Sequence, residues 1–323
     1  MKKAVYANKQ GNIQPLLLRN PRKKFWHSIT RNWELYLLFL PVLVYYIIFS
    51  YVPLYGIQLA FKRFSPSLGI FGSRWVGFDN FTRFFNGAMF SRTLTNTLGI
   101  SFYTLAAGFW PPIILALMLN EVKIKFFKKT VQTITYMPHF ISTVVMAGMI
   151  IIYLSPSSGG FVPKIMEFFG KEPVNLLYDA KYFKHIYVLS GIWQGIGWGS
   201  ILYLAALAGI DEEIYEAAII DGASRMQRIW HINIPGIMPT VCILLILNCG
   251  GIMNVGFEKV FLLMNDLNTS GAEVISTYTY KMGLINRDFG FSTAVGLFNS
   301  VINCTLLITV NTIVRKLGQA SLI

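Results

Sequence analysis

Charged residues are scarce in this sequence, and their scarcity excludes an ordinary soluble domain. Only 13% of the 323 residues are charged, whereas 54% are hydrophobic. Since a soluble domain has roughly 25% charged residues, we expect lipid to replace water over much of the protein surface. The net charge of +13 does not indicate nucleic acid as a partner, because many of the basic residues flank apolar runs, where an anionic leaflet attracts them.

Cysteine and histidine are also rare, and neither type forms a pattern typical of a metal or catalytic site. The three cysteines lie inside apolar segments without metal-like spacing, at Cys242, Cys249 and Cys304. This excludes a disulfide framework or a zinc site and favours a packing role. His139 stands in "YMPHF", and we favour a capping or interfacial role for it over a place in a proton path.

The sequence lacks the motifs of an enzyme that hydrolyses a nucleotide. No G-x-x-x-x-G-K-[ST] phosphate-binding loop occurs, because Gly170-Lys171 is followed by Glu172. No acidic cluster in or beside an apolar run supports a membrane enzyme such as a glycosyltransferase. We therefore expect no catalytic residue, no metal and no cofactor in this chain.

Long apolar runs are abundant and predict an all-α membrane protein. A transmembrane helix needs about 20 mostly apolar residues, and six charge-free windows have this length: 35–61, 93–120, 130–163, 185–210, 232–257 and 289–314. The third window is longer than one span and is expected to include an outer turn at "SPSSGG" (155–160). We predict six transmembrane helices in a domain at 35–323, after a basic tail at 1–34.

The flanking charges predict the orientation. Eight Lys and Arg residues precede the first window, and four lysines crowd the segment 123–129. Because positive charge favours the cytoplasmic side, both termini are expected in the cytoplasm, with the chain in the cell membrane. The first window follows a long basic tail and is interpreted as a retained span rather than a signal peptide.

A polar elbow stands between the fourth and fifth windows, in "EIYEAAIIDGASRMQRIWHINIPG" (213–236). We expect a helix, a turn at Gly222 with positive φ, and a second amphipathic helix that Pro235 ends. The elbow as a whole is placed at 211–235, on the cytoplasmic side. An acidic first helix is poorly suited to an anionic lipid surface, which disfavours the alternative of a loop lying on the bilayer.

The elbow resembles the EAA motif of ABC importer permeases. The resemblance is carried by Glu216, Ala217, Ala218, Gly222, Ile232 and Pro235, with Ile234 where that family usually has leucine. The segments "FEKVFLLMND" (257–266) and "FGFSTAVGLFNSVIN" (289–303) look like carbohydrate-importer permeases. The start "LFLPVLVYYIIFSYVPLYG" (38–56) and the tail "RKLGQASLI" (315–323) are similar to the subgroup named for the LplB permease, which is associated with complex oligosaccharides.

This resemblance implies a type I ABC importer permease (MetI-like) fold with a cytoplasmic coupling helix. It implies a second, non-identical permease subunit, two ATPase subunits that bind ATP and Mg, and an extracytoplasmic solute-binding protein that delivers a carbohydrate. By resemblance Glu216 faces basic groups of the ATPase, and Gly222 is the hinge. The coupling residues are then Glu216, Ala217, Ala218, Asp221, Gly222, Ile232 and Pro235.

Polar residues inside the windows are candidates for a substrate path. In the fourth window Gly191, Gly195 and Gly199 form a small-residue stripe, beside a face with Gln194 and Trp198. The other candidates are amides of the last two windows: Asn248, Asn254, Asn299 and Asn303. The first two flank Gly250-Gly251, where the helix is expected to bend or unwind. Hydrogen bonding between helices is the alternative interpretation of all these amides.

Two other functions remain open on the sequence alone. A secondary transporter working alone explains the windows, but windows free of Asp, Glu, Lys and Arg disfavour ion coupling. An ABC importer with another cargo, such as a sialic acid, an amino acid or a peptide, fits the same features.

Overall fold

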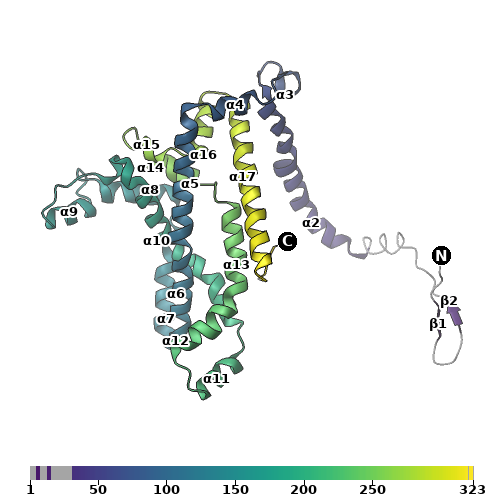
Figure 1. The fold of residues 1–323 in the computed structure, drawn as a ribbon, viewed down its shortest axis with the longest axis vertical. Coiled ribbons are helices and arrows are strands. Elements are labelled where there is room, and N and C mark those ends of the chain that lie inside the picture. Colours follow the sequence, from purple (N-terminus) through teal and green to yellow (C-terminus); the bar gives the residue numbers. More distant parts are fainter. Residues whose placement is uncertain (1–4, 8–12, 16–30, 319, 323) are drawn as a thin grey trace. The chain divides into compact units, whose positions relative to one another are not determined.

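The computed structural model describes residues 5–7, 13–15, 31–318 and 320–322 of the chain. The chain divides into two compact units, Met1–Ile57 and Gln58–Ile323, each shown in Figure 1. In the first unit, β1 (Val5–Ala7) pairs antiparallel with β2 (Ile13–Pro15). Helix α2 (Trp33–Tyr46) then continues through a π-helical turn, η1 (Ile47–Tyr51). Most of the predicted basic tail at 1–34 lies outside the described residues.

The second unit is almost entirely helical. Its first half contains η2 (Val52–Phe61, which begins in the first unit), β3 (Lys62–Arg63), α3 (Gly69–Gly72), β4 (Arg74–Trp75), α4 (Asp79–Phe85), α5 (Ala88–Gly108), α6 (Trp110–Glu121), α7 (Lys125–Tyr136), η3 (Met137–Phe140), α8 (Thr143–Leu154) and α9 (Phe161–Phe168). Its second half contains η4 (Leu176–Tyr178), α10 (Ala180–Ala208), α11 (Glu212–Ile220), α12 (Arg225–Arg228), η5 (Ile229–Asn233), α13 (Ile234–Gly250), α14 (Phe257–Leu263), α15 (Thr269–Ala272), α16 (Ile275–Tyr280), η6 (Lys281–Ile285) and α17 (Phe289–Lys316).

Several of these helices are long and apolar enough to cross a membrane. The described residues contain four such helices, Trp33–Phe61, Ala88–Glu121, Arg225–Gly250 and Phe289–Lys316. A fifth is obtained if the bent pair Lys125–Phe140 and Thr143–Leu154 is one span. Helix α10 covers the predicted window 185–210 with 29 residues but is not among them, since glycine, serine and glutamine dilute its apolar residues. A membrane protein of many helices is thus confirmed, and the expected number of six is not.

Two of the predicted windows are interrupted. The window 130–163 does not contain one straight span, because its helices meet at an angle of 97°. Pro138 stands in the η3 turn at this bend, and Ser142 caps the next helix by accepting a hydrogen bond from the backbone N–H of Val145. In the window 232–257, α13 stops at Gly250, where the sequence predicts that the helix bends or unwinds. Two consecutive glycines weaken a helix at that point, as the sequence had indicated.

Helix α10 is the centre of the second unit. It packs against α5, α6, α7 and α13. The approach to α7 is very close, because a Cβ atom at Gly197 would lie 2.1 Å from the carbonyl oxygen of Thr135. Small residues of this kind are what lets helices pack closely in membranes.

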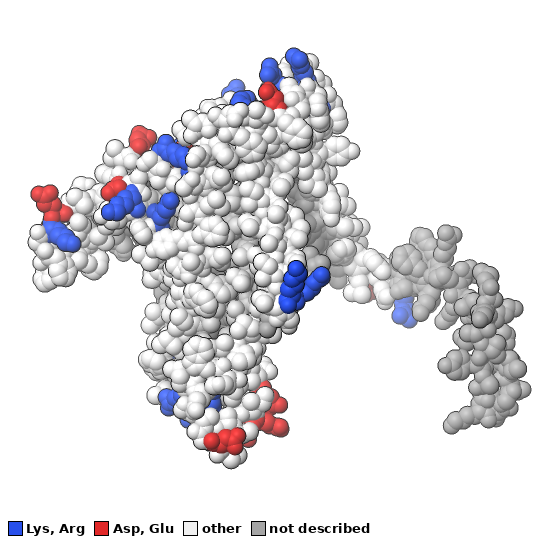
Figure 2. Space-filling model, viewed as in Figure 1, with Lys and Arg blue, Asp and Glu red and all other residues white. Residues whose placement is uncertain are grey.

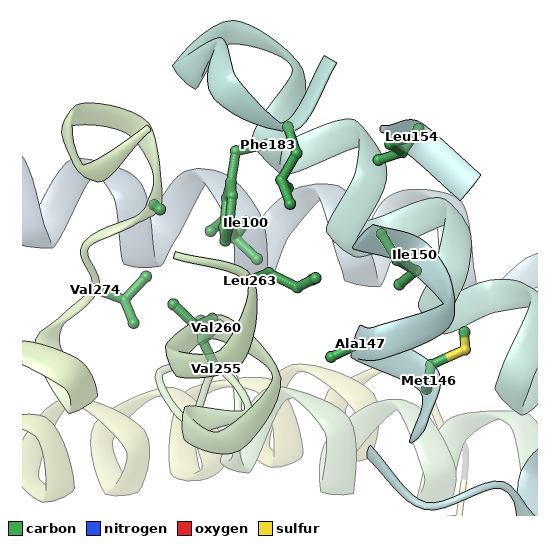
Figure 3. Close-up of a cluster of buried hydrophobic side chains, with 12 residues drawn as sticks. Ile100, Met146, Ala147, Ile150, Leu154, Phe183, Val255, Val260, Leu263 and Val274 are labelled. Atoms are coloured by element: carbon green, nitrogen blue, oxygen red, sulfur yellow. The ribbon is translucent and has the colours of Figure 1, made fainter. Parts of the chain in front are cut away.

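A second set of contacts joins the N-terminal part of α10 to α5, α8 and α14. Figure 3 shows side chains from α5, α8, α10 and α14 pointing toward one another, among them Ile100, Ile150, Phe183 and Leu263, and all four are buried. Other large apolar side chains point outward, such as Met118, which is 64% exposed. The face drawn in Figure 2 has a broad uncharged area between its two ends. The outward apolar surface therefore suits contact with lipid.

The close contact at Gly197 gives a first prediction. Replacing Gly197 with Ala should lower the melting temperature of the detergent-purified protein, because the added methyl group forces α7 and α10 apart. Overpacking of this kind costs about 1–3 kcal/mol. Gly148 on α8 is the matched control, since a Cβ atom there meets nothing within 4 Å. Equal melting temperatures for the two variants would contradict the proposed packing.

Candidate functional site

The polar elbow begins with a well-capped acidic helix. The Asp211 carboxylate accepts a hydrogen bond from the backbone N–H of Glu213 at 3.0 Å, and Glu212 and Glu213 occupy the first turn of α11. Acidic side chains in this position are stabilised by the helix dipole. The start of α11 is therefore determined by residues of its own first turn.

The turn between α11 and α12 depends on a glycine. Gly222 has a φ of +76°, the left-handed conformation that the sequence predicted. The backbone N–H of Ala223 donates to the Ala218 carbonyl at 2.8 Å, and that of Gly222 donates to the Ile219 carbonyl at 3.0 Å. This pair of bonds is the Schellman arrangement, which closes a helix with a left-handed residue.

The second helix of the elbow does not end where the sequence predicted. A capping box of Ser224 and Gln227 starts α12. The chain is then helical without interruption over Arg225–Gly250, so the prediction that Pro235 ends this helix is wrong. The π-helical turn η5 ends at Asn233, two residues before the proline. In a π-helical turn the backbone hydrogen bonds span five residues instead of four. This change of pattern lets the helix continue although Pro235 has no backbone N–H to donate.

The outer surface of the elbow combines acidic and apolar side chains. Of the predicted coupling residues, Glu216, Ala217, Asp221, Gly222 and Pro235 are exposed, and Ala218 and Ile232 are half-buried. Figure 2 shows the acidic residues gathered at this end of the second unit. Beside them Ile219 is 58% exposed and Ile220 is 85% exposed. Exposed apolar side chains bordered by charge are typical of a surface that binds another protein.

The inner surface of the elbow is fixed by a polar network. The Tyr215 hydroxyl on α11 donates to Oδ1 of Asn233, which is fully buried, while Nδ2 of Asn233 has no partner among the described residues. Burial raises the pKa of Tyr215. The Arg228 guanidinium donates to the Ala223 carbonyl at 3.0 Å and lies 3.9 Å from the Glu121 carboxylate at the end of α6. These contacts connect α11 to the long helix after it, and that helix to α6.

A cavity of about 340 Å³ lies farther along the same helices. It is lined by α5, α6, α10, the end of α13 and the segment that follows α13. Its polar lining residues are Ser101, Thr104, Tyr187, Asn248 and Asn254. The remaining lining residues are apolar or glycine, and no charged side chain is among them. Hydroxyl and amide groups on an apolar wall are suited to a neutral or polar organic ligand.

Three of the predicted amides meet at the edge of this cavity. Oδ1 of Asn254 accepts hydrogen bonds from Nδ2 of Asn299 at 3.0 Å and from Nδ2 of Asn303 at 3.2 Å. Oδ1 of Asn303 in turn accepts from the backbone N–H of Met253 at 2.9 Å. The cluster thus holds the chain just after α13 ends and places Asn254 in the cavity wall. Asn248, the fourth predicted amide, also lines the cavity.

The predicted pair Gln194 and Trp198 is not part of the cavity lining. Nε2 of Gln194 donates to the Ile141 carbonyl at 2.9 Å. The Trp198 ring stacks on His139, with 4.4 Å between the ring centroids. Both side chains therefore support the bend between α7 and α8, which contains Ile141 and His139. Of the glycine stripe, Gly191 and Gly195 line the cavity.

Other cavity residues had no recognisable signal in the sequence. Ser101, Thr104 and Tyr187 stand in or beside apolar windows, where nothing in the spacing separates them from packing residues. Ser101 is the most informative of them, because its hydroxyl is buried without a partner among the described residues. Within the same residues, no group of three or more His, Cys, Asp or Glu side chains comes together as a metal site.

Comparisons with known proteins give a consistent result. Residues 112–319 match the family described as "Binding-protein-dependent transport system inner membrane component". The chain is 43% identical to Protein LplB of Bacillus subtilis (strain 168), covering 95% of this chain and 96% of that protein. It is 41% identical to the polygalacturonan/rhamnogalacturonan transport system permease protein YteP of the same organism, covering 93% and 94%.

A solved structure also matches over nearly the whole chain. It is the crystal structure of a bacterial ABC transporter involved in the import of the acidic polysaccharide alginate. The matching chain has a TM-score of 0.83 and 41% sequence identity, covering 91% of this chain and 99% of that chain.

The network under the elbow gives a second prediction. Replacing Tyr215 with Phe should increase hydrogen–deuterium exchange of the backbone amides at 212–228, because buried Asn233 then loses its partner. An unsatisfied buried polar group costs about 1–3 kcal/mol. Tyr178→Phe is the control, since that side chain is 54% exposed and lies outside the elbow. Unchanged exchange in Tyr215→Phe would show that the network does not hold α11.

Proposed function

Because the chain belongs to the family of binding-protein-dependent transport system inner membrane components, it is the inner-membrane permease of an ABC importer, and we propose that its cargo is an oligosaccharide. The permease is not itself an ATPase. The cargo is supported by relatives whose names include polygalacturonan/rhamnogalacturonan and arabinooligosaccharides, and by the structural match to an alginate importer. The hydroxyl and amide groups of the cavity suit such a cargo.

The observation that carries the mechanism is the exposed elbow at the end of a continuous helix. We propose that two ATPase subunits, which bind the ATP and Mg, dock on the elbow residues of this chain and of a second, non-identical permease. Glu216 and Asp221 offer negative charge to basic groups, and exposed Ile219 and Ile220 offer apolar contact. Ala217 and Ala218 let the partner surface approach closely.

The uninterrupted helix Arg225–Gly250 provides a mechanical connection. In our proposal, closure of the ATPase dimer moves α11, and the Tyr215–Asn233 hydrogen bond passes this displacement to the long helix. The helix ends next to the amide cluster, so its movement changes the cavity wall at Asn254. Docking of a loaded extracytoplasmic binding protein favours the same closed state, since coupling between two sites is reciprocal.

We propose an orientation in the membrane that is supported by charge and contact together. The Glu121–Arg228 contact places the basic segment 123–129 at the same end of the helices as the elbow. Positive charge at this end supports a cytoplasmic elbow. We propose that α10 is also a span, which gives six spans with both termini in the cytoplasm.

The cavity is proposed as part of the sugar path. Asn248, Asn254 and Tyr187 have side chains that can bind sugar hydroxyl groups. Asn299 and Asn303 act through Asn254, which they hold in place. We assign Gln194 and Trp198 to the bend between α7 and α8, where their hydrogen bond and ring stacking are already used.

The coupling proposal gives a third prediction. Glu216→Lys and Gly222→Val should each lower ATP-dependent oligosaccharide uptake by at least about tenfold and reduce co-purification of the ATPase. The first change reverses a charge, and the second forbids the positive φ at a cost of about 1 kcal/mol or more. Membrane insertion should be unchanged, as judged by the amount of permease in washed membranes.

The control for the charge reversal is Glu34→Lys, an exposed glutamate at the start of α2, outside the elbow. It should support normal uptake. Full uptake and full ATPase recovery in both elbow variants would contradict the docking proposal.

A further inference from the structure

A lysine without a carboxylate partner is buried beside the cavity. Lys259 on α14 is only 8% exposed, and no carboxylate among the described residues lies within 4.0 Å of its ammonium group. Its Nζ donates to the Tyr187 carbonyl at 2.9 Å. Burial lowers the pKa of Lys259 to about 8. A buried cation of this kind is unfavourable unless something negative compensates it.

Two other lysines provide a comparison for Lys259. Lys281, in the same half of the chain, forms an ion pair with Glu273 at 2.7 Å. Lys62 is also 8% exposed and donates to a backbone carbonyl, that of Ile70, at 2.8 Å. Neither Lys62 nor its partner Ile70 lines the cavity. The hydrogen bond to Ile70 is therefore a sufficient explanation for the burial of Lys62. Lys259 differs from Lys62 because its hydrogen-bond partner, Tyr187, lines the cavity.

The ammonium group of Lys259 stands directly behind the cavity wall. It lies 4.7 Å from the centre of the Tyr187 ring, and Tyr187 lines the cavity. Gly191, one helical turn later on α10, lines it as well, and a Cβ atom at Gly191 would lie 3.5 Å from the Lys259 Nζ. Lys259 itself does not line the cavity. Because Gly191 has no side chain, no Cβ atom covers the ammonium group at this position of the wall, and we call this uncovered position the gap at Gly191.

We propose that the Lys259 ammonium group, reached through the gap at Gly191, binds the carboxylate of an acidic sugar unit as it passes through the cavity. This inference rests on the proposed function as an oligosaccharide permease. The ammonium group has three N–H donors, and the bond to the Tyr187 carbonyl uses one of them. A carboxylate supplies the missing negative charge, and its bond to an ammonium group is stronger than one between neutral groups. The uncharged remainder of the lining then binds the hydroxyl groups and the ring.

The test is direct binding of two sugars to the purified assembled transporter. Trigalacturonate carries a carboxylate on every unit, and galactotriose is the neutral counterpart. Replacing Lys259 with Gln should weaken trigalacturonate binding by about tenfold or more, as expected for the loss of one charge-assisted hydrogen bond. Galactotriose binding should change little, so the ratio of the two dissociation constants falls. Lys259→Arg keeps the charge and should retain most of the preference.

Two further variants separate a binding role from a structural one. Lys62→Gln removes a lysine of equal exposure away from the cavity and should leave the ratio of dissociation constants unchanged. Gly191→Ala closes the gap and should weaken trigalacturonate binding more than galactotriose binding. Either an equal loss for both sugars in Lys259→Gln or no saturable trigalacturonate binding by the wild type would overturn the inference.

The failure of this inference is distinguishable from a failure of the proposed function. If the wild type takes up oligosaccharides with ATP and Lys259→Gln has an unchanged sugar preference, only the inference is wrong. If the wild type takes up neither trigalacturonate nor galactotriose while its ATPase remains active, the proposed cargo is wrong, and the inference falls with it.

Discussion

The structure depends on satisfying backbone polar groups wherever a helix is interrupted among apolar surroundings. Lipid offers no hydrogen bonds, so each break must be supported from within the protein. After α13 the amide of Asn303 binds the free N–H of Met253, and at the α7–α8 bend Gln194 binds the free carbonyl of Ile141. These two amides therefore make the bent architecture possible, which explains polar residues inside otherwise apolar segments.

The same constraint connects the two ends of the permease. The helix continues from the elbow to Gly250, although it contains Pro235 and Pro239. Its π-helical turn lets it include Pro235 without breaking. At one end of this helix, Tyr215 of the elbow is hydrogen-bonded to Asn233. At the other end lies the amide cluster around Asn254. In the proposed mechanism, these contacts carry a displacement at the elbow to the cavity.

Much of the fold could be predicted, because apolar windows and local turn chemistry depend on neighbouring residues alone. The long helices, the positive φ of Gly222 and the weak point at Gly250-Gly251 all follow from sequence. The straightness of a window does not, since the 97° bend before α8 is also supported by a hydrogen bond from Gln194 on α10, which is distant in sequence. The helix end predicted at Pro235 was wrong, because the π-helical turn before Pro235 lets the helix continue without the backbone N–H that proline lacks.

The sequence by itself determined the membrane character, the elbow and the amides, since composition and short-range spacing specify them. Only the tertiary structure decided which polar side chains share a cavity. It placed Asn254 with Asn299 and Asn303, and it assigned Gln194 to a bend instead. It also brought Lys259 behind a glycine 68 positions earlier in the chain. Such meetings depend on how helices cross, and helix crossing is set by packing between segments that are distant in sequence.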